Sequence, residues 1–373
     1  MSALATHSTL AEGAPRFIGS IPVRNLWLLM LYASDLYRQL GSTKITVEDN
    51  PEDIADLVAE ILCHQVERRL MRNLSYGYES KVAVIGRVRG RIDTLYTECH
   101  RLLDKGKVCC RFEELTVDTS RNRYVRSALE KLNSLVNKTN LAHRCRSLAM
   151  SLDRLGVTKG KPTGYSGKSE RLGRHDAEDQ KMLAAADLAF ALALPTEFTG
   201  QHYLSMPDKD IVWLRNLFEK SIAGFYAVAL EKTEWRVLAG KQFNWQISHK
   251  SEGIEAIMPN MKTDIIIDKK SSGKRLVIDT KFNSVTTKGW YREDTLRSGY
   301  IYQMYAYLRS QEDLQDAKSF TTSGMLLHPS VDCDVDELVA IQGHSIRFCT
   351  VNLGLDAANI KEQLLNLIVT EEH

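Results

Sequence analysis

Two short apolar runs near residue 270 constrain the fold of this chain more than any other feature. Residues 265–267 are Ile-Ile-Ile and residues 276–278 are Leu-Val-Ile, and the segment between them is rich in Lys, Ser and Gly. Apolar runs of this length, separated by turn residues, are typical of two buried strands joined in an antiparallel hairpin. We therefore expect strands at 263–268 and 275–281.

Charged residues stand at one end of this predicted hairpin. Asp264 begins the first strand, and Asp279 and Lys281 end the second. Strand alternation puts Asp279 and Lys281 on one face, and antiparallel pairing brings Asp264 to the same end. Two close carboxylates repel unless a cation lies between them, and oxygen ligands suit Mg²⁺. The pattern predicts a metal site in which Lys281 orients water or stabilises charge on a phosphorus atom.

Other interpretations of these residues remain open, because a lone Asp-x-Lys also fits a surface hairpin with a salt bridge. Glu219, on a helix predicted at 210–231, would add a metal ligand or remain a solvated helix residue. Gln303, on a helix predicted at 295–310, would reach the site or a phosphate. The tyrosines around Gln303 are expected to be packing residues with hydroxyls at the edge.

The rest of the chain mixes helical and extended patterns. Asn50-Pro51 predicts the start of a helix that runs to about Arg72. Further helices are expected at 22–40 (ended by Gly41), 121–136, 141–152, 181–194 and 357–369, and further extended segments at 82–96, 108–117, 237–243, 323–327 and 345–351. We predict a disordered tail at 1–17, an α+β region at 18–200, and an α/β domain at 201–373 with a central mixed sheet flanked by helices.

Composition and charge exclude several classes of protein. The net charge is only +2, so any nucleic-acid surface must be local. The seven cysteines form no Cys-x-x-Cys pair, which indicates neither a disulfide framework nor a zinc site and favours a reducing compartment. Cys109-Cys110 is expected to be a strand pair with one side chain on each face. No export signal or membrane span is recognisable, so we expect a cytoplasmic protein with no membrane partner.

Gly167-Lys168-Ser169 looks like the end of a phosphate-binding P-loop. That motif needs a glycine five residues before Gly167, where this chain has Pro162, which has no N–H to offer a phosphate. We therefore expect no nucleotide to bind here. The surrounding basic stretch, 154–175, is expected to be a solvated loop, with nucleic-acid contact as the alternative.

The order of the candidate residues resembles the PD-(D/E)xK nuclease superfamily. The matching residues are Glu219 on a helix, Asp264, Asp279-Thr280-Lys281 and Gln303 on a second helix, with Thr263 in place of the usual proline. The resemblance implies a restriction-endonuclease-like domain. It also implies that Mg²⁺ is held by Asp264, Asp279, the main-chain carbonyl of Thr280 and Glu219.

Several separated motifs over residues 18–330 are similar to those of the McrC family and occur in the expected order. They are Ile21–Leu26, Leu31–Ala33, Gly90–Asp93, Phe112–Glu114, Asn122-Arg123, Ile278–Phe282 and Tyr302–Tyr307. The resemblance implies the endonuclease subunit of a type IV, 5-methylcytosine-dependent restriction system. Its partner would be McrB, a hexameric AAA+ GTPase that binds the GTP, and its substrate double-stranded DNA.

The resemblance also implies a division of labour within the chain. The N-terminal part would dock in the hexamer and stimulate GTP hydrolysis, and the C-terminal domain would cut DNA. Part of residues 82–96 would enter the hexamer pore or form an ordinary hairpin. Two other functions remain open: a non-catalytic adaptor that activates the GTPase, and a stand-alone nuclease.

Overall fold

The computed structural model describes residues 17–18, 21–40, 53–169, 177–198, 208–243, 245–287, 295–315, 317–331 and 334–369. Its contacts divide the chain into two compact units, one made of Met1–Ile54 with Leu192–His373 and the other of Ala55–Ala191. This division differs from the predicted boundary at 200/201. The N-terminal helices belong with the C-terminal sheet, as described below. The predicted tail, residues 1–17, lies outside the described residues except for Phe17.

A six-stranded mixed sheet forms the centre of the first unit. The strand order is β14-β15-β13-β10-β9-β6. The strands are β6 (Trp235–Ala239), β9 (Ile265–Lys269), β10 (Arg275–Thr280), β13 (Ser323–Ser330), β14 (Asp336–Ile341) and β15 (His344–Asn352). β10, β13 and β15 are parallel, while β6, β9 and β14 join antiparallel to their neighbours. The predicted central mixed sheet with flanking helices is confirmed.

The predicted hairpin is also confirmed. β9 and β10 pair antiparallel from Arg275 opposite Asp268 to Ile278 opposite Ile265. The inner residues of both strands are completely buried, because the sheet is covered on both faces.

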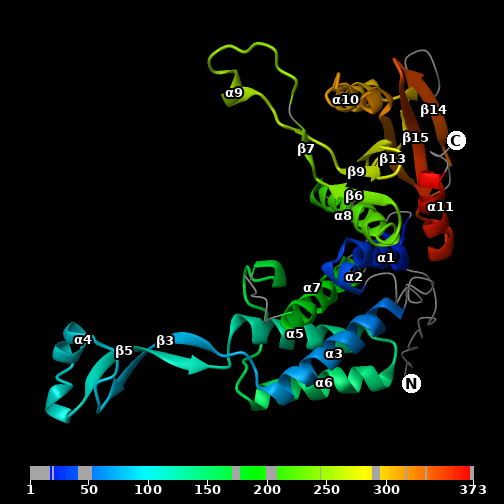
Figure 1. Cartoon of the computed structure of the whole chain (residues 1–373). Helices are drawn as coiled ribbons and strands as arrows, with labels where there is room; N and C mark the ends of the chain where they lie inside the picture. The colour runs from blue at the N-terminus through cyan, green and yellow to red at the C-terminus, as the bar shows by residue number, and fades with distance from the viewer. Residues whose placement is uncertain are drawn as a thin grey trace, which may run out of the picture. The chain divides into compact units, whose positions relative to one another are not determined.

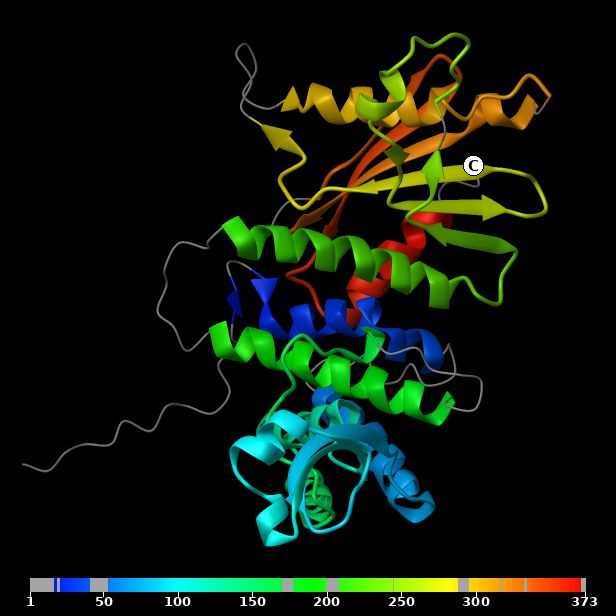
Figure 2. The same ribbon diagram turned by 90° about the vertical axis from the view of Figure 1, so that its left-hand side faces the viewer.

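Helices cover both faces of this sheet (Figure 2). α10 (Ser298–Arg309) lies on one face, where Met304 and Leu308 pack against Val277 and Leu326. α8 (Asp208–Ala229) and α11 (Ala357–Val369) lie on the other, where the Tyr226 hydroxyl donates a hydrogen bond to the carbonyl of Leu364. Successive side chains along a strand point to opposite faces of the sheet, and those on either face therefore pack against a helix.

The predicted helix 22–40 is in fact two helices, α1 (Val23–Ala33) and α2 (Asp35–Leu40). Ser34 separates them with extended backbone angles. Its hydroxyl donates to the Leu31 carbonyl at 2.6 Å and accepts from the Tyr37 amide at 3.1 Å, so one side chain satisfies the end of α1 and the start of α2. The expected stop at Gly41 and the start at Asn50-Pro51 lie outside the described residues.

Two contacts attach α1 to the C-terminal part of the chain. The buried amide of Asn25 donates to the carbonyls of Leu353 at 2.7 Å and Leu355 at 2.8 Å. Gly224 of α8 lies so close to α1 that an added Cβ would stand 1.9 Å from the carbonyl oxygen of Tyr32. These contacts explain why the first 54 residues group with the sheet domain.

Replacing Gly224 by alanine is expected to destabilise this unit by about 3 kcal/mol, because the clashing atom is backbone and cannot rotate away. Thermal unfolding of the purified chain measures the effect. Gly299→Ala is the matched control, since a Cβ at Gly299 meets nothing within 4 Å. Equal melting temperatures for the two variants would contradict the close α1–α8 approach.

Short elements complete this unit around the sheet. They are β1 (Phe17–Ile18), β2 (Ile21–Pro22), β7 (Gln242–Phe243), α9 (Ile254–Ile257), β8 (Met261–Lys262), β11 (Thr286–Thr287), β12 (Thr295–Leu296) and the 3₁₀ turn η6 (Ala317–Thr321). The predicted strand 237–243 is split by Gly240, whose φ of +64° separates β6 from β7. β14 was not predicted from the sequence.

The second unit contains four long helices and a small sheet. The helices are α3 (Ile54–Arg72), α5 (Ser120–Leu135), α6 (Thr139–Arg154) and α7 (Ala177–Phe198, whose last turns belong to the first unit). Thr119 caps α5 by accepting from the Asn122 amide at 3.2 Å. The predicted helix end near Arg72 and the helices near 121–136, 141–152 and 181–194 are confirmed.

A β-arm, residues 77–116, extends from these helices (Figure 1). β3 (Gly77–Ile85) and β5 (Val108–Thr116) pair antiparallel along their whole length, and β4 (Arg91–Ile92), α4 (Thr94–Cys99) and the 3₁₀ turn η3 (Leu103–Lys105) form its far end. Cys109 and Cys110, predicted to point to opposite faces, are both buried within β5. The arm exposes many large apolar side chains, namely Tyr78, Val82, Val84, Val88, Ile92, Leu95, Tyr96, Leu103 and Leu115.

The Gly167-Lys168-Ser169 segment forms the 3₁₀ turn η4 in this unit. The Gly167 amide donates to a carboxylate oxygen of Asp187 at 2.9 Å. The Asp187 carboxylate therefore accepts the hydrogen bond that the amide of a P-loop glycine would donate to a phosphate. Across the described ranges, no helix is long and apolar enough to span a bilayer.

Candidate metal centre

The end of the β9–β10 hairpin brings the candidate carboxylates together. The last paired residues are Ile278 and Ile265. Continuing this register by one residue places Asp279 opposite Asp264, as expected from the sequence. Asp279 is only 2% exposed, and Asp264 is half-buried.

Asp264 is oriented by the residue that follows Asp279. One of its oxygens, Oδ2, accepts hydrogen bonds from the Thr280 amide at 2.7 Å and the Thr280 hydroxyl at 2.8 Å. The two bonds fix the carboxylate across the hairpin end. The sequence predicted a role for Thr280 only through its main-chain carbonyl and did not indicate these contacts of its amide and side chain.

Asp279 is a buried carboxylate that lies between an ammonium group and a second carboxylate. Its Oδ2 forms an ion pair with Nζ of Lys281 at 2.6 Å. Burial raises the pKa of Asp279 to about 6, with Lys281 opposing the rise and Asp264 adding to it. A buried oxygen of this kind, beside a second carboxylate, fits a hard divalent cation such as Mg²⁺.

Lys281 is held between three groups. Besides Asp279, its Nζ donates to the side-chain oxygen of Gln303 at 3.0 Å and lies 4.9 Å from the ring centre of Tyr300. The ammonium group therefore partly neutralises Asp279. The structure therefore places Gln303 beside Lys281, one of the candidate site residues.

A chain of hydrogen bonds continues from Gln303 along α10. Its amide nitrogen donates to the Tyr307 hydroxyl at 2.6 Å, and that hydroxyl donates to the Lys262 carbonyl at 2.9 Å. Tyr307 was expected to be a packing residue, and it is 6% exposed. Its polar role was detectable, because residues four apart share a helix face. The chain of bonds ties α10 to the segment that leads into Asp264.

Glu219 lies near this centre on α8 but is not part of a compact ligand cluster. Burial raises its pKa, and the charge of Asp264 adds to the effect, while nearby lysines including Lys281 oppose it. Among the described residues, no three His, Cys, Asp or Glu side chains gather closely enough to hold a metal ion. Mg²⁺ commonly takes one or two carboxylates and completes its shell with water, so Asp264 and Asp279 remain the candidate pair.

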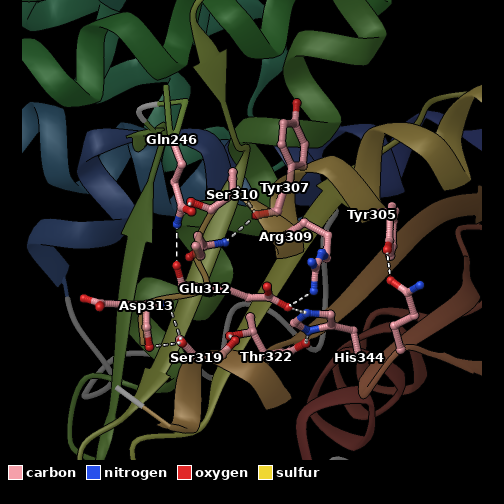
Figure 3. A network of polar contacts seen from close by, with 12 residues as sticks. Gln246, Tyr305, Tyr307, Arg309, Ser310, Glu312, Asp313, Ser319, Thr322 and His344 are labelled. Carbon is pink, nitrogen blue, oxygen red and sulfur yellow. Dashed lines mark hydrogen bonds and ion pairs between the residues drawn. The ribbon is translucent and has the colours of Figure 1, made fainter. Parts of the chain in front are cut away.

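A second polar network fixes the other end of α10 (Figure 3). Buried His344 of β15 lies with Nε2 2.8 Å from a carboxylate oxygen of Glu312 and Nδ1 2.9 Å from the Thr322 carbonyl. Arg309, in the last turn of α10, forms an ion pair with the same glutamate. The network anchors α10 to the sheet and so helps to set the position of Gln303.

The fold and this centre define a mixed α/β protein with paired carboxylates and a lysine at one end of a hairpin. The chain belongs to the family described as McrBC 5-methylcytosine restriction system component, whose model matches residues 6–329. This match confirms the family resemblance found in the sequence.

Comparison with known proteins gives one curated relative from Escherichia coli strain K12, the type IV methyl-directed restriction enzyme EcoKMcrBC. It is 25% identical over 357 residues, which cover 93% of this chain and 97% of the relative. One solved structure similar to this chain is a half-complex of the Thermococcus gammatolerans McrB AAA+ hexamers with bound McrC. It has a TM-score of 0.41, 13% identity, and coverage of 93% of this chain and 76% of that one. Another is the McrBC complex of the same organism, with a TM-score of 0.30, 11% identity, and coverage of 50% of this chain and 60% of that one.

Proposed function

We propose that this chain is the DNA-cutting subunit of its restriction system, a Mg²⁺-dependent endodeoxyribonuclease of the PD-(D/E)xK type. The observation that carries the proposal is the buried carboxylate of Asp279, which lies opposite Asp264 and forms an ion pair with Lys281. A purely structural salt bridge does not require a second carboxylate opposite it, and the second carboxylate makes burial of the first less favourable.

Each residue of the centre has a distinct task in this proposal. Asp264 and Asp279, with the main-chain carbonyl of Thr280, hold the metal, and Glu219 assists from α8. When bound, Mg²⁺ lowers the pKa of water and offsets charge on the phosphate. Lys281 places its ammonium beside the reacting phosphate, and Gln303 holds that ammonium in position.

The substrate and partner are proposed from the family. The family description names 5-methylcytosine and the E. coli relative is described as methyl-directed, which supports DNA that carries methylated cytosine as the substrate. We propose that a hexameric AAA+ GTPase binds the GTP and that this chain stimulates its hydrolysis. The β-arm supplies the docking projection, since its exposed apolar side chains need a partner surface to become buried.

Shortening the β-arm is expected to remove stimulation of the GTPase by at least about tenfold, as loss of a docking anchor commonly costs more than 2 kcal/mol. Ile85 and Val108 are paired, so an Asn-Gly turn in place of residues 86–107 closes the hairpin with little strain. GTP hydrolysis with added chain is the measurement. Thermal unfolding checks that the rest of the molecule is intact, and full stimulation by the shortened, folded chain would contradict the docking role.

The wild-type chain with its GTPase partner, Mg²⁺, GTP and variously methylated DNA provides the test of function. We expect cleavage of methylated DNA that requires this chain, the partner, Mg²⁺ and GTP. Accelerated GTP hydrolysis without cleavage of any DNA would instead show a non-catalytic adaptor. Efficient cleavage by this chain alone would show a stand-alone nuclease. A gene for an AAA+ protein beside the gene for this chain would support the two-part assembly.

A further inference from the structure

Three side chains beside Lys281 have no task in the proposed reaction. They are Asn283, two residues beyond Lys281, Tyr300 in the first turn of α10, and His328 near the end of β13. β13 is the parallel neighbour of β10, and the Lys281 amide donates to the carbonyl of Leu327 at 2.9 Å. The pairing therefore brings His328 beside the backbone that carries the lysine.

These three residues form a connected chain of contacts that ends at the ammonium group. The Nδ1 atom of His328 lies 2.8 Å from the Asn283 carbonyl, to which it donates. The Asn283 amide donates to the Tyr300 hydroxyl. The Tyr300 ring has its centre 4.9 Å from Nζ of Lys281, within the range of a cation–π contact.

His328 provides a rigid, uncharged base for this chain of contacts. It is only 1% exposed, and its ring centre lies 6.0 Å from that of Tyr300. Burial lowers the pKa of His328 to about 4, and the charge of Lys281 adds to the effect, while the hydrogen bond to Asn283 opposes it. The imidazole is therefore neutral at neutral pH and does not repel the ammonium group.

We propose that Tyr300, held by Asn283 and His328, is a positioning residue that keeps the Lys281 ammonium against Asp279 and Gln303. A lysine side chain has four flexible carbons, and loss of any fixed contact lets it sample many rotamers. The tyrosine ring contacts the ammonium group in addition to Asp279 and Gln303, and so restricts the rotamers of Lys281 further. This inference rests on the proposed function, in which the place of the ammonium sets the rate.

Three variants of α10 test the role of the ring. Tyr300→Leu removes the aromatic face, and Tyr300→Phe keeps the face but loses the hydroxyl. Tyr302→Leu is the matched control, because Tyr302 is on the same helix and is 70% exposed. With partner, GTP and saturating Mg²⁺, Tyr300→Leu is expected to lower kcat by about tenfold, consistent with a partly desolvated cation–π contact. The half-saturating Mg²⁺ concentration and the KM for DNA stay unchanged. Tyr300→Phe keeps the ring but loses the hydrogen bond from Asn283, so its kcat falls between those of Tyr300→Leu and wild type, and the control matches wild type.

A second readout does not depend on cleavage. Nζ of Lys281 reacts with an amine-directed acylating reagent, and mass spectrometry compares its rate with that of exposed Lys270 in the same molecule. Tyr300→Leu is expected to raise the relative labelling of Lys281 several-fold and Tyr300→Phe to raise it by less, whereas Tyr302→Leu leaves it near the wild-type value. Unchanged labelling in folded Tyr300→Leu, or an equal loss of kcat in both Tyr300 variants, would overturn the inference. A wild-type chain that never cuts DNA refutes the proposed function, and the labelling result still decides the role of Tyr300.

Discussion

Replacing Lys281 by alanine is expected to reduce DNA cleavage by about 100-fold or more, the loss typical when one charge-stabilising donor is removed from an active site. The reason is geometric. Its ammonium lies 2.6 Å from the Asp279 carboxylate and 3.0 Å from Gln303, at the place where charge develops on the phosphate in the proposed reaction. Single-turnover cleavage by the complete complex measures the effect.

Lys281→Ala is expected to affect DNA cleavage but not the action of this chain on the GTPase partner. Stimulation of GTP hydrolysis should be unchanged, because the β-arm is distant in sequence and belongs to the other unit. Lys270→Ala is the matched control, since Lys270 is an exposed lysine at the opposite end of the same hairpin. Equal cleavage rates for Lys281→Ala and Lys270→Ala would remove Lys281 from the mechanism.

Replacing Asp279 by asparagine is expected to stabilise the metal-free protein at pH 8. The folded-state pKa of Asp279 is raised from 3.8 to about 6, chiefly by burial. The folded state therefore holds the proton more tightly than the unfolded state. The contribution of this group is most favourable below about pH 3.8 and is lost as the pH rises through about 6. Asparagine is neutral throughout, so at pH 8 it avoids a loss of about 3 kcal/mol.

Thermal unfolding with and without Mg²⁺ separates this electrostatic cost from metal binding. With a chelator present at pH 8, Asp279→Asn should melt at a higher temperature than wild type. The difference between the two melting temperatures should shrink as the pH falls below 6. Added Mg²⁺ should raise the melting temperature of wild type and leave the variant nearly unchanged, because only a charged pair binds the ion well. Asp268→Asn is the control, since Asp268 pairs with Arg275 and gains nothing from neutralisation. A variant less stable than wild type at pH 8 without metal would contradict the account of Asp279.

The sequence predicted the hairpin and its end because both depend on a local pattern, two short apolar runs separated by a turn. Ile265–Ile267 and Leu276–Ile278 are apolar throughout, as strands buried on both faces must be, and the turn between them fixes which residues meet. The helix that carries Gln303 was also expected from the sequence, and its contact with Lys281 arises because a helix that follows β10 and leads into a parallel β13 must cross the sheet.

Features that depend on distant contacts were not predictable in this way. The grouping of the first 54 residues with the C-terminal sheet rests on Asn25 bonding to carbonyls near residue 353 and on the close approach at Gly224, neither of which follows from a local pattern. β14 was missed because its residues are exposed on both faces and give no alternation. The site contacts of Thr280 and Tyr300 depend on side-chain placement after folding.

The most direct test compares the complete wild-type complex with one that carries Asp279→Ala, both supplied with Mg²⁺, GTP and methylated DNA. The account predicts that the two complexes assemble and hydrolyse GTP equally well and that only the wild-type complex cuts DNA. Cleavage by the Asp279→Ala complex at the wild-type rate would show that the hairpin end formed by Asp264, Asp279 and Lys281 is not the cutting site.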